Sequence, residues 1–135
     1  MIQRIQSVLL FLAFLFNGSI FFNALYSHAM DDPMQWIGIS FAIVLTLAAL
    51  APLGCIFLYG NRQNQLSWVT RSLILQVIAL GFALGIYISL GGFGVFLWDE
   101  TIGLGFLVVA LLLQLYARKK IKDDIELVQS MDRIR

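Results

Sequence analysis

The apolar stretches of this chain hold polar residues but no ionisable ones. No Asp, Glu, Lys, Arg or His lies within residues 5–26, 36–59, 72–90 or 101–117. Ion-coupled transporters, proton relays and voltage sensors depend on ionisable side chains inside the membrane. The sequence therefore argues against these three classes.

The remaining candidates for catalysis or metal binding have few neighbours of the required type. His28 is the only histidine, and Asp31 and Asp32 follow it in one polar turn. We interpret His28 as a bystander at the membrane interface. Asp99 and Glu100 would join the first two carboxylates around a divalent cation only if the two turns met, and exposed acidic turns are expected to be solvated. Nucleophile-elbow, phosphate-loop and dinucleotide motifs are absent. We therefore expect no enzymatic activity, no metal and no cofactor.

The uncharged polar residues of the apolar stretches are expected to join helices. Asn17 and Asn23 lie in the first stretch, and Gln76 lies in the third. Small and polar residues let membrane helices approach, and each hydrogen bond between them contributes about 0.6–2 kcal/mol. In the alternative, Asn17 and Gln76 border a cavity for a lipid-like or quinone-like molecule, with Pro52 beside them.

Two backbone signals lie in the second and third stretches. Pro52 lacks an N–H, so it is predicted to kink its helix, and a neighbouring helix or a hydroxyl must satisfy the carbonyl it frees. Gly81 and Gly85 form a GxxxG motif. We expect this motif to pack against another helix of the same chain, and homo-oligomer formation is the alternative.

The composition indicates that lipid surrounds much of the surface of this protein. Of its 135 residues, 60% are hydrophobic and 13% are charged, about half the charged fraction of a soluble domain. The net charge of +1 argues against nucleic acid as a partner. The single cysteine, Cys55, allows no intrachain disulfide and is expected to be a small buried hydrophobe.

Four stretches are long enough to cross a bilayer, which needs about 20 apolar residues. They predict an all-α membrane protein of four transmembrane helices in two antiparallel hairpins, spanning 5–26, 36–59, 72–90 and 101–117. The first stretch is longer than the apolar core of a signal peptide, so we interpret it as a span. Residues 118–135 are expected to continue the last helix as a charged, semi-amphipathic cytoplasmic tail.

The connections are predicted from turn residues. Residues 60–71 are interpreted as a polar loop, with Gly60 and Asn61 as the C-terminal cap of the second helix. Gly91–Gly94 is interpreted as a turn before the fourth helix.

Charge placement predicts the topology. The basic residues flank only one side of the four predicted spans, and the other side has acidic turns. By the positive-inside rule, both termini and the 60–71 connection are cytoplasmic. The basic residues are Arg4, Arg62, Arg71, Arg118, Lys119, Lys120, Lys122, Arg133 and Arg135.

Both ends of the chain resemble a known family. The opening MIQRIQ (1–6), the ending SMDRIR (130–135), the Ala117-Arg118-Lys119 step and the Asn61-Arg62 turn are similar to an uncharacterised bacterial family of small four-helix membrane proteins. That family is classed only as a domain of unknown function. The resemblance covers the whole chain and implies four spans in a bacterial inner membrane, and it implies no activity.

We therefore expect a non-enzymatic inner-membrane protein that is an accessory or assembly subunit of a membrane protein complex. Its partners would be the lipid bilayer and another membrane protein, reached through the tail or the bundle. The alternative is a binder or carrier of a lipid-like or quinone-like molecule. The residues expected to contact a partner or lipid headgroups are Arg118, Lys119, Lys120, Lys122, Asp132, Arg133 and Arg135.

Overall fold

The computed structural model describes residues 2–31, 34–58, 60–91 and 98–134, and the regular elements in these ranges are all helical. Four of the helices are long and apolar enough to cross a membrane, as the sequence predicted. The elements are α1 (Ile2–Ser19), the 3-10 turn η1 (Ile20–Phe22), α2 (Ala24–Met30), α3 (Gln35–Ile56), α4 (Arg62–Ser89) and α5 (Trp98–Ile134).

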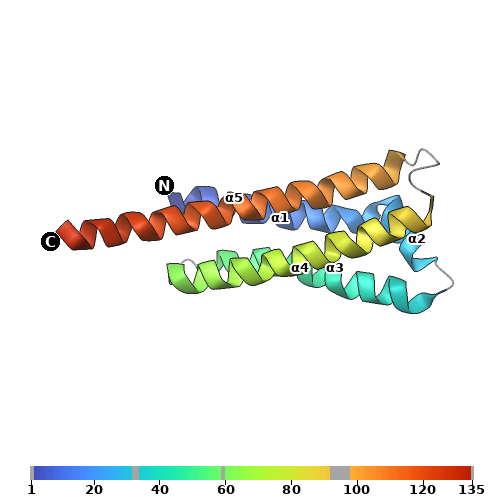
Figure 1. Ribbon diagram of the computed structural model, residues 1–135, viewed down its shortest axis with the longest axis horizontal. Coiled ribbons are helices and arrows are strands. Elements are labelled where there is room, and N and C mark those ends of the chain that lie inside the picture. Colours follow the sequence, from blue (N-terminus) through green and yellow to red (C-terminus); the bar gives the residue numbers. More distant parts are fainter. Residues whose placement is uncertain (1, 32–33, 59, 92–97, 135) are drawn as a thin grey trace.

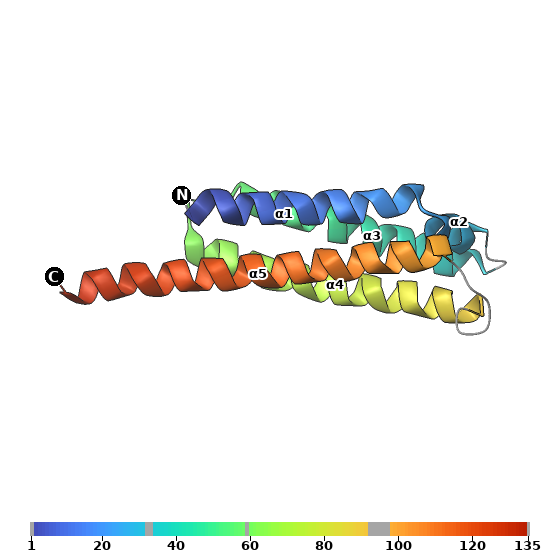
Figure 2. The same cartoon turned by 90° about the horizontal axis from the view of Figure 1, so that it is seen from above.

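The four long helices form a bundle in which each has two main neighbours. Helix α1 packs against α3 and α5, and α4 packs against the same two helices. The short helix α2 lies at one end of the bundle, and both chain termini lie at the other (Figure 1). Helix α5 extends past the ends of α1 and α4 (Figures 1 and 2).

The predicted first helix, 5–26, is interrupted near its end. The backbone at Asn23 is extended, with φ −93° and ψ 152°. Its side-chain oxygen accepts a hydrogen bond from the N–H of Leu25 at 2.9 Å and so caps the start of α2. Asparagine offers the backbone this alternative to a continuous helix. A prediction based on apolar length alone misses this interruption.

The polar stretch 60–71 is mostly helix, which corrects the predicted loop. Helix α3 ends at Ile56, and α4 begins at Arg62. Asn61 caps the start of α4, since its side chain accepts a hydrogen bond from the N–H of Asn64 at 3.1 Å. Asn61 therefore begins the third long helix instead of ending the second. The polar composition of this stretch does not exclude a helix, because Gln and Arg are good helix formers.

Helix α5 is continuous from Trp98 to Ile134, which confirms that the tail continues the last helix. It begins three residues before the predicted start at Thr101, with Asp99 and Glu100 in its first turn. Acidic residues there are favourable to the helix dipole. Of the predicted turn, Gly91 has a φ of +80°, and the rest lies in 92–97, outside the described residues.

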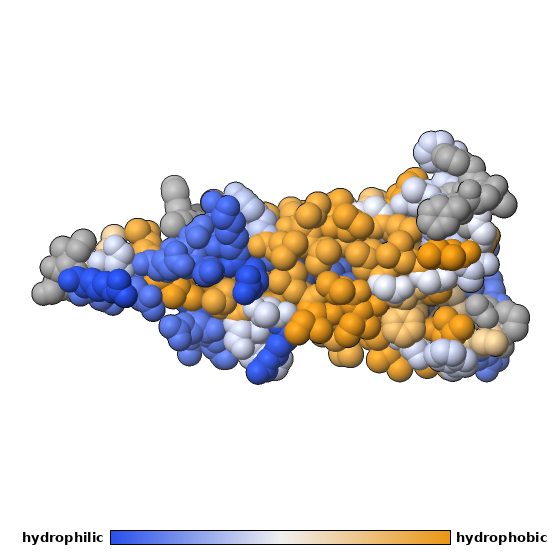
Figure 3. All heavy atoms as spheres, viewed as in Figure 1, coloured by the Kyte–Doolittle hydropathy of each residue, from blue (hydrophilic) through white to orange (hydrophobic). Residues whose placement is uncertain are grey.

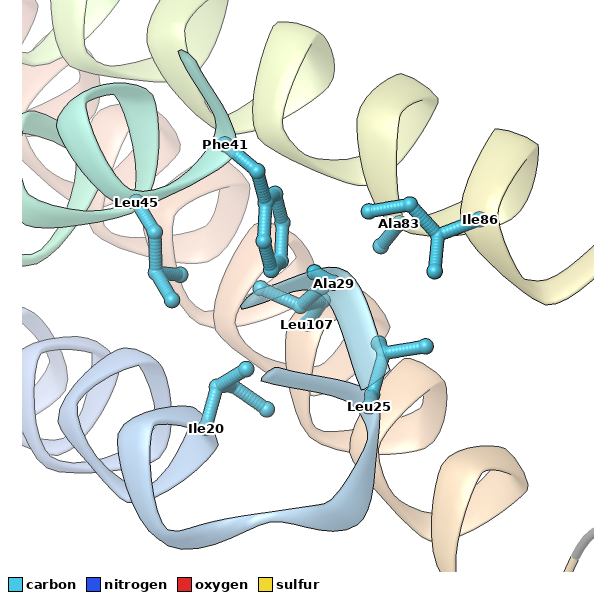
Figure 4. Close-up of a cluster of buried hydrophobic side chains, with 8 residues drawn as sticks. All are labelled: Ile20, Leu25, Ala29, Phe41, Leu45, Ala83, Ile86 and Leu107. Carbon is cyan, nitrogen blue, oxygen red and sulfur yellow. The ribbon is translucent and has the colours of Figure 1, made fainter. Parts of the chain in front are cut away.

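Apolar packing gathers at both ends of the bundle. Eight buried residues form the cluster at the α2 end: Ile20, Leu25, Ala29, Phe41, Leu45, Ala83, Ile86 and Leu107 (Figure 4). The cluster at the other end consists of Leu10, Cys55, Val69, Ala117 and Ile121. Cys55 is buried there, as expected for a small hydrophobe. Hydrophobic residues also cover the outer surface of the bundle's middle (Figure 3).

The approach of α2 to α3 predicts a measurable effect of one methyl group. A Cβ added at Gly38 would lie 2.5 Å from the carbonyl oxygen of Ala29. Because this neighbour is backbone, Gly38→Ala is expected to lower the stability of the detergent-solubilised protein by about 1–3 kcal/mol, the usual cost of overpacking. Thermal unfolding followed by circular dichroism measures it.

Gly54→Ala is the matched control in the same helix, since a Cβ there meets no atom within 4 Å. It is expected to leave the melting temperature unchanged or slightly higher. Equal melting temperatures for the two variants would show that α2 does not approach α3 this closely.

Candidate functional site

The centre of the bundle contains two buried amides that bond each other. Asn17 of α1 donates from Nδ2 to Oε1 of Gln76 in α4 at 2.8 Å, and Gln76 donates from Nε2 to Oδ1 of Asn17 at 3.0 Å. Both side chains are fully buried. The sequence singled out both residues, and the structure brings them together across the bundle.

Two more side chains extend this pair to α5. Gln114 donates from Nε2 to Oε1 of Gln76 at 3.0 Å, and Ser72 donates from its hydroxyl to Oε1 of Gln114 at 2.9 Å. Gln76 also donates to the carbonyl of Leu107 at 3.2 Å. We call Asn17, Ser72, Gln76 and Gln114 the amide network. Its side-chain hydrogen bonds join α1 to α4 and α4 to α5.

The amide network also includes α3 through a backbone group. Pro52 has no N–H to donate to the carbonyl of Ala48, four residues before it. Asn17 donates its Nδ2 to that carbonyl at 3.0 Å. A neighbouring helix therefore satisfies the carbonyl that the proline frees, as the sequence predicted.

The bonding pattern supports helix joining as the role of these amides. Each side chain of the amide network bonds another member, and each is at most 1% exposed. Neutral amides and a hydroxyl of this kind hold helices in register. The surface grooves described below are lined by other residues.

Gly81 and Gly85 do not pack against another helix of the chain, which corrects the expected role of the GxxxG motif. A Cβ added at either meets no atom within 4 Å. The buried stripe of α4 runs through Gln76, Ala79 and Ala83, and the two glycines lie on a different face. That face borders an apolar groove of about 560 Å³, lined by Trp36, Ile37, Ile78, Gly81, Phe82, Gly85, Ile86 and Ser89.

At the α2 end, His28 has a partner, so it is not the bystander that we expected. Its Nε2 lies 2.9 Å from Oε1 of Glu100, whose side chain is 7% exposed. Glu100 is thus buried and not simply solvated. Beside this pair, Asn23 donates from Nδ2 to the carbonyl of Asp99 at 2.9 Å, and its side chain fits against Gly103. These contacts tie α2 and the α1–α2 junction to the start of α5.

At the other end, three contacts organise the tail. Arg62 Nε lies 2.8 Å from Oδ2 of Asp124, which is nearly buried. Arg118 donates from Nε to the hydroxyl of Thr70 at 3.1 Å. The Lys120 ammonium lies 5.2 Å from the centre of the Tyr116 ring. Four other predicted contact residues are exposed, namely Lys119, Lys122, Asp132 and Arg133, and Arg135 lies outside the described residues.

The sequence analysis missed several of these partners. Ser72 and Gln76 are one helical turn apart, and Gln114 is the one amide in the stretch 101–117. That spacing was a usable signal for a shared network. No such signal indicates the partners of Glu100 and Asp124. These partners come from distant segments, and only the folded bundle determines how far along its axis each segment lies.

The link between Asn17 and Pro52 predicts coupled stabilities. Asn17→Leu removes the donor to the Ala48 carbonyl and two of the four hydrogen bonds of the Gln76 amide, so unfolding stability is expected to fall by about 1–3 kcal/mol. In a Pro52→Ala background, the new N–H of residue 52 bonds the Ala48 carbonyl. The cost of Asn17→Leu is then expected to fall by about 0.6–2 kcal/mol, the value of one membrane hydrogen bond.

Reversible unfolding in mixed micelles, over the four proteins of the double-mutant cycle, measures this coupling. Thr46→Val is the control in the same helix, because that hydroxyl is exposed and bonds only the carbonyl of its own turn at Ala42. Strictly additive effects of the two substitutions would refute the proposed link.

The comparisons with known proteins identify the family alone. No curated protein and no solved structure matches the chain. One family model matches residues 2–134, almost the entire chain, and it is described as a domain of unknown function, DUF4293. The chain, with its four long apolar helices joined by an amide network, belongs to this DUF4293 family.

Proposed function

We propose that this protein is a non-enzymatic accessory or assembly subunit of a membrane protein complex in a bacterial inner membrane. The observation that carries the proposal is the free end of α5. Helix α5 extends beyond the bundle (Figure 1) and exposes Leu127 and Met131 there, at 48% and 59%. Large apolar side chains on a protruding helix favour a protein partner.

The length of α5 supports this placement of the tail. Its 37 residues extend over about 55 Å at 1.5 Å per residue, while the hydrocarbon core is about 30 Å thick. If the span ends near Ala117, Leu127 lies about 15 Å further along a continuous helix. A membrane surface would not cover it there, so a protein is the better occupant.

The topology that we propose has two antiparallel hairpins with both termini in the cytoplasm. The alternating directions of α1, α3, α4 and α5 in Figure 1 are consistent with it. Hydrophilic residues gather over the tail of α5 and the adjacent start of α4 (Figure 3). The basic residues there favour the cytoplasmic side.

The alternative function is binding of a lipid-like molecule, and one observation favours it. The apolar groove beside Gly81 and Gly85 has a volume of about 560 Å³. It lies between α3 and α4 and would accept a single acyl chain from the bilayer. Quantitative lipid analysis of a Gly81→Leu/Gly85→Leu variant separates this function from the first, since the α5 tail is unchanged.

The topology predicts where reporters are active. Alkaline phosphatase fused after Arg135 is expected to be inactive, because it is active only outside the cytoplasm. Green fluorescent protein at the same site is expected to fluoresce, because it fluoresces on the cytoplasmic side of a bacterial inner membrane. A fusion of alkaline phosphatase within 92–97 is expected to be active. Phosphatase activity of the Arg135 fusion would contradict the orientation.

The proposed partner surface predicts a position-dependent crosslink. A photoreactive amino acid at Met131 is expected to give one discrete protein adduct in native membranes, identified by mass spectrometry. The same amino acid at Leu112, an exposed residue of the apolar belt, is the control and is expected to give lipid adducts. Adducts of lipid mass at Met131 would place the tail on the membrane and contradict the accessory role.

A further inference from the structure

A polar groove lies between α4 and α5 where the apolar belt ends. It has a volume of about 450 Å³ and is lined by Gln63, Leu66, Ser67, Thr70, Arg71, Arg118 and Ile125. Its lining contains two guanidinium groups, two hydroxyl groups and one amide. Within the described part of the chain, no carboxylate lines it. We call it the arginine groove.

The two arginines of the groove are held in place without a neutralising partner. Arg118 donates from Nε to the Thr70 hydroxyl at 3.1 Å, and the Arg71 guanidinium lies 4.8 Å from the centre of the Trp68 ring. Among the described residues, no carboxylate lies within ion-pair distance of either guanidinium. By contrast, nearby Arg62 is paired with Asp124 at 2.8 Å. Two cations from different helices thus face one groove with their charge available to an anion.

The position of these arginines suggests which anion they meet. Arg71 directly precedes the apolar stretch 72–90, and Arg118 directly follows the apolar stretch 101–117. Both therefore mark the same boundary of the predicted membrane region, where lipid phosphates lie. Trp68, which is 45% exposed beside Arg71, is a residue type typical of that level. In the proposed topology this boundary is the cytoplasmic one, and the cytoplasmic leaflet is anionic.

The geometry points to the arginine groove as a binding site for the phosphate of an anionic phospholipid headgroup. Guanidinium groups bind phosphate oxygens through paired N–H donors. Arg71 and Arg118 would bind the phosphodiester, and the hydroxyl of Ser67 would donate to a remaining oxygen. The acyl chains would lie along the apolar belt beside α4 and α5. This site does not depend on the accessory function, because it uses neither Leu127 nor Met131.

Lipid titration of the full-length protein in detergent, read by native mass spectrometry, tests this site. Phosphatidylglycerol is expected to bind about tenfold more tightly than phosphatidylcholine, since both carry the same phosphodiester but the choline cation of the latter is repelled by the two guanidinium groups. The Arg71→Gln/Arg118→Gln variant is expected to lose this preference. Arg62→Gln removes a cation that Asp124 already pairs and that does not line the groove, and it is expected to retain the preference.

Four outcomes would overturn the site. The preference for phosphatidylglycerol could survive in the double variant, or Arg62→Gln could abolish it equally. Glycerol 1-phosphate at the same concentration could displace the lipid fully, and the ligand would then be a soluble phosphate. An acidic peptide that displaced the lipid would assign the groove to a protein instead.

Folding is checked separately from lipid binding. The Arg118 substitution removes the contact with Thr70 and could change folding. Arg71→Gln alone changes an exposed side chain, so this single variant tests lipid binding without that change. It is expected to lose several-fold in phosphatidylglycerol affinity, with the melting temperature of the lipid-free protein unchanged. An unchanged affinity for a folded Arg71→Gln protein would contradict the proposal.

Discussion

The bundle depends on one constraint: polar groups inside hydrocarbon must find their partners within the protein. Pro52 creates one such group, because it leaves the carbonyl of Ala48 without the N–H donor that a regular helix supplies. Asn17 supplies the donor from a neighbouring helix and bonds Gln76 with the same amide. A sliding or rotation of α1 against α3 or α4 would break both bonds together. The proline thus helps to set the register of three helices.

This constraint also explains why chemistry is sparse in the middle and richer at the ends. The amides of the network are occupied with one another, so they hold the helices and leave no free group for a ligand. The ionisable residues lie at the two ends of the bundle. There His28 lies beside Glu100 at one end and Arg62 beside Asp124 at the other, and both carboxylates are buried against these partners. Recognition by this protein is therefore more plausible at its ends than at its centre.

Local signals in the sequence were enough for the helical class, the four apolar spans and the continuation of α5 into the tail. They also identified Asn17 and Gln76 and the need to satisfy the carbonyl freed by Pro52. They failed where two segments must be placed relative to each other. The GxxxG motif does not indicate which face of α4 packs against the other helices. The partner of Glu100 depends on the break in the helix at Asn23. Apolar length does not encode such breaks, because a capping asparagine is as uncharged as its neighbours.

The position of Asp124 bears on how the tail would meet a partner. Its contact with Arg62 lies beyond the predicted membrane boundary and fastens α5 to the start of α4, seven residues after Ala117. Ile121, buried one turn earlier, adds apolar packing to this attachment. The exposed stretch that follows is therefore held at a fixed angle to the bundle. A surface oriented in this way loses less conformational entropy on binding than a free tail would. For the proposed partner, the ion pair would contribute to recognition without touching that partner, because it would present Leu127 and Met131 already ordered.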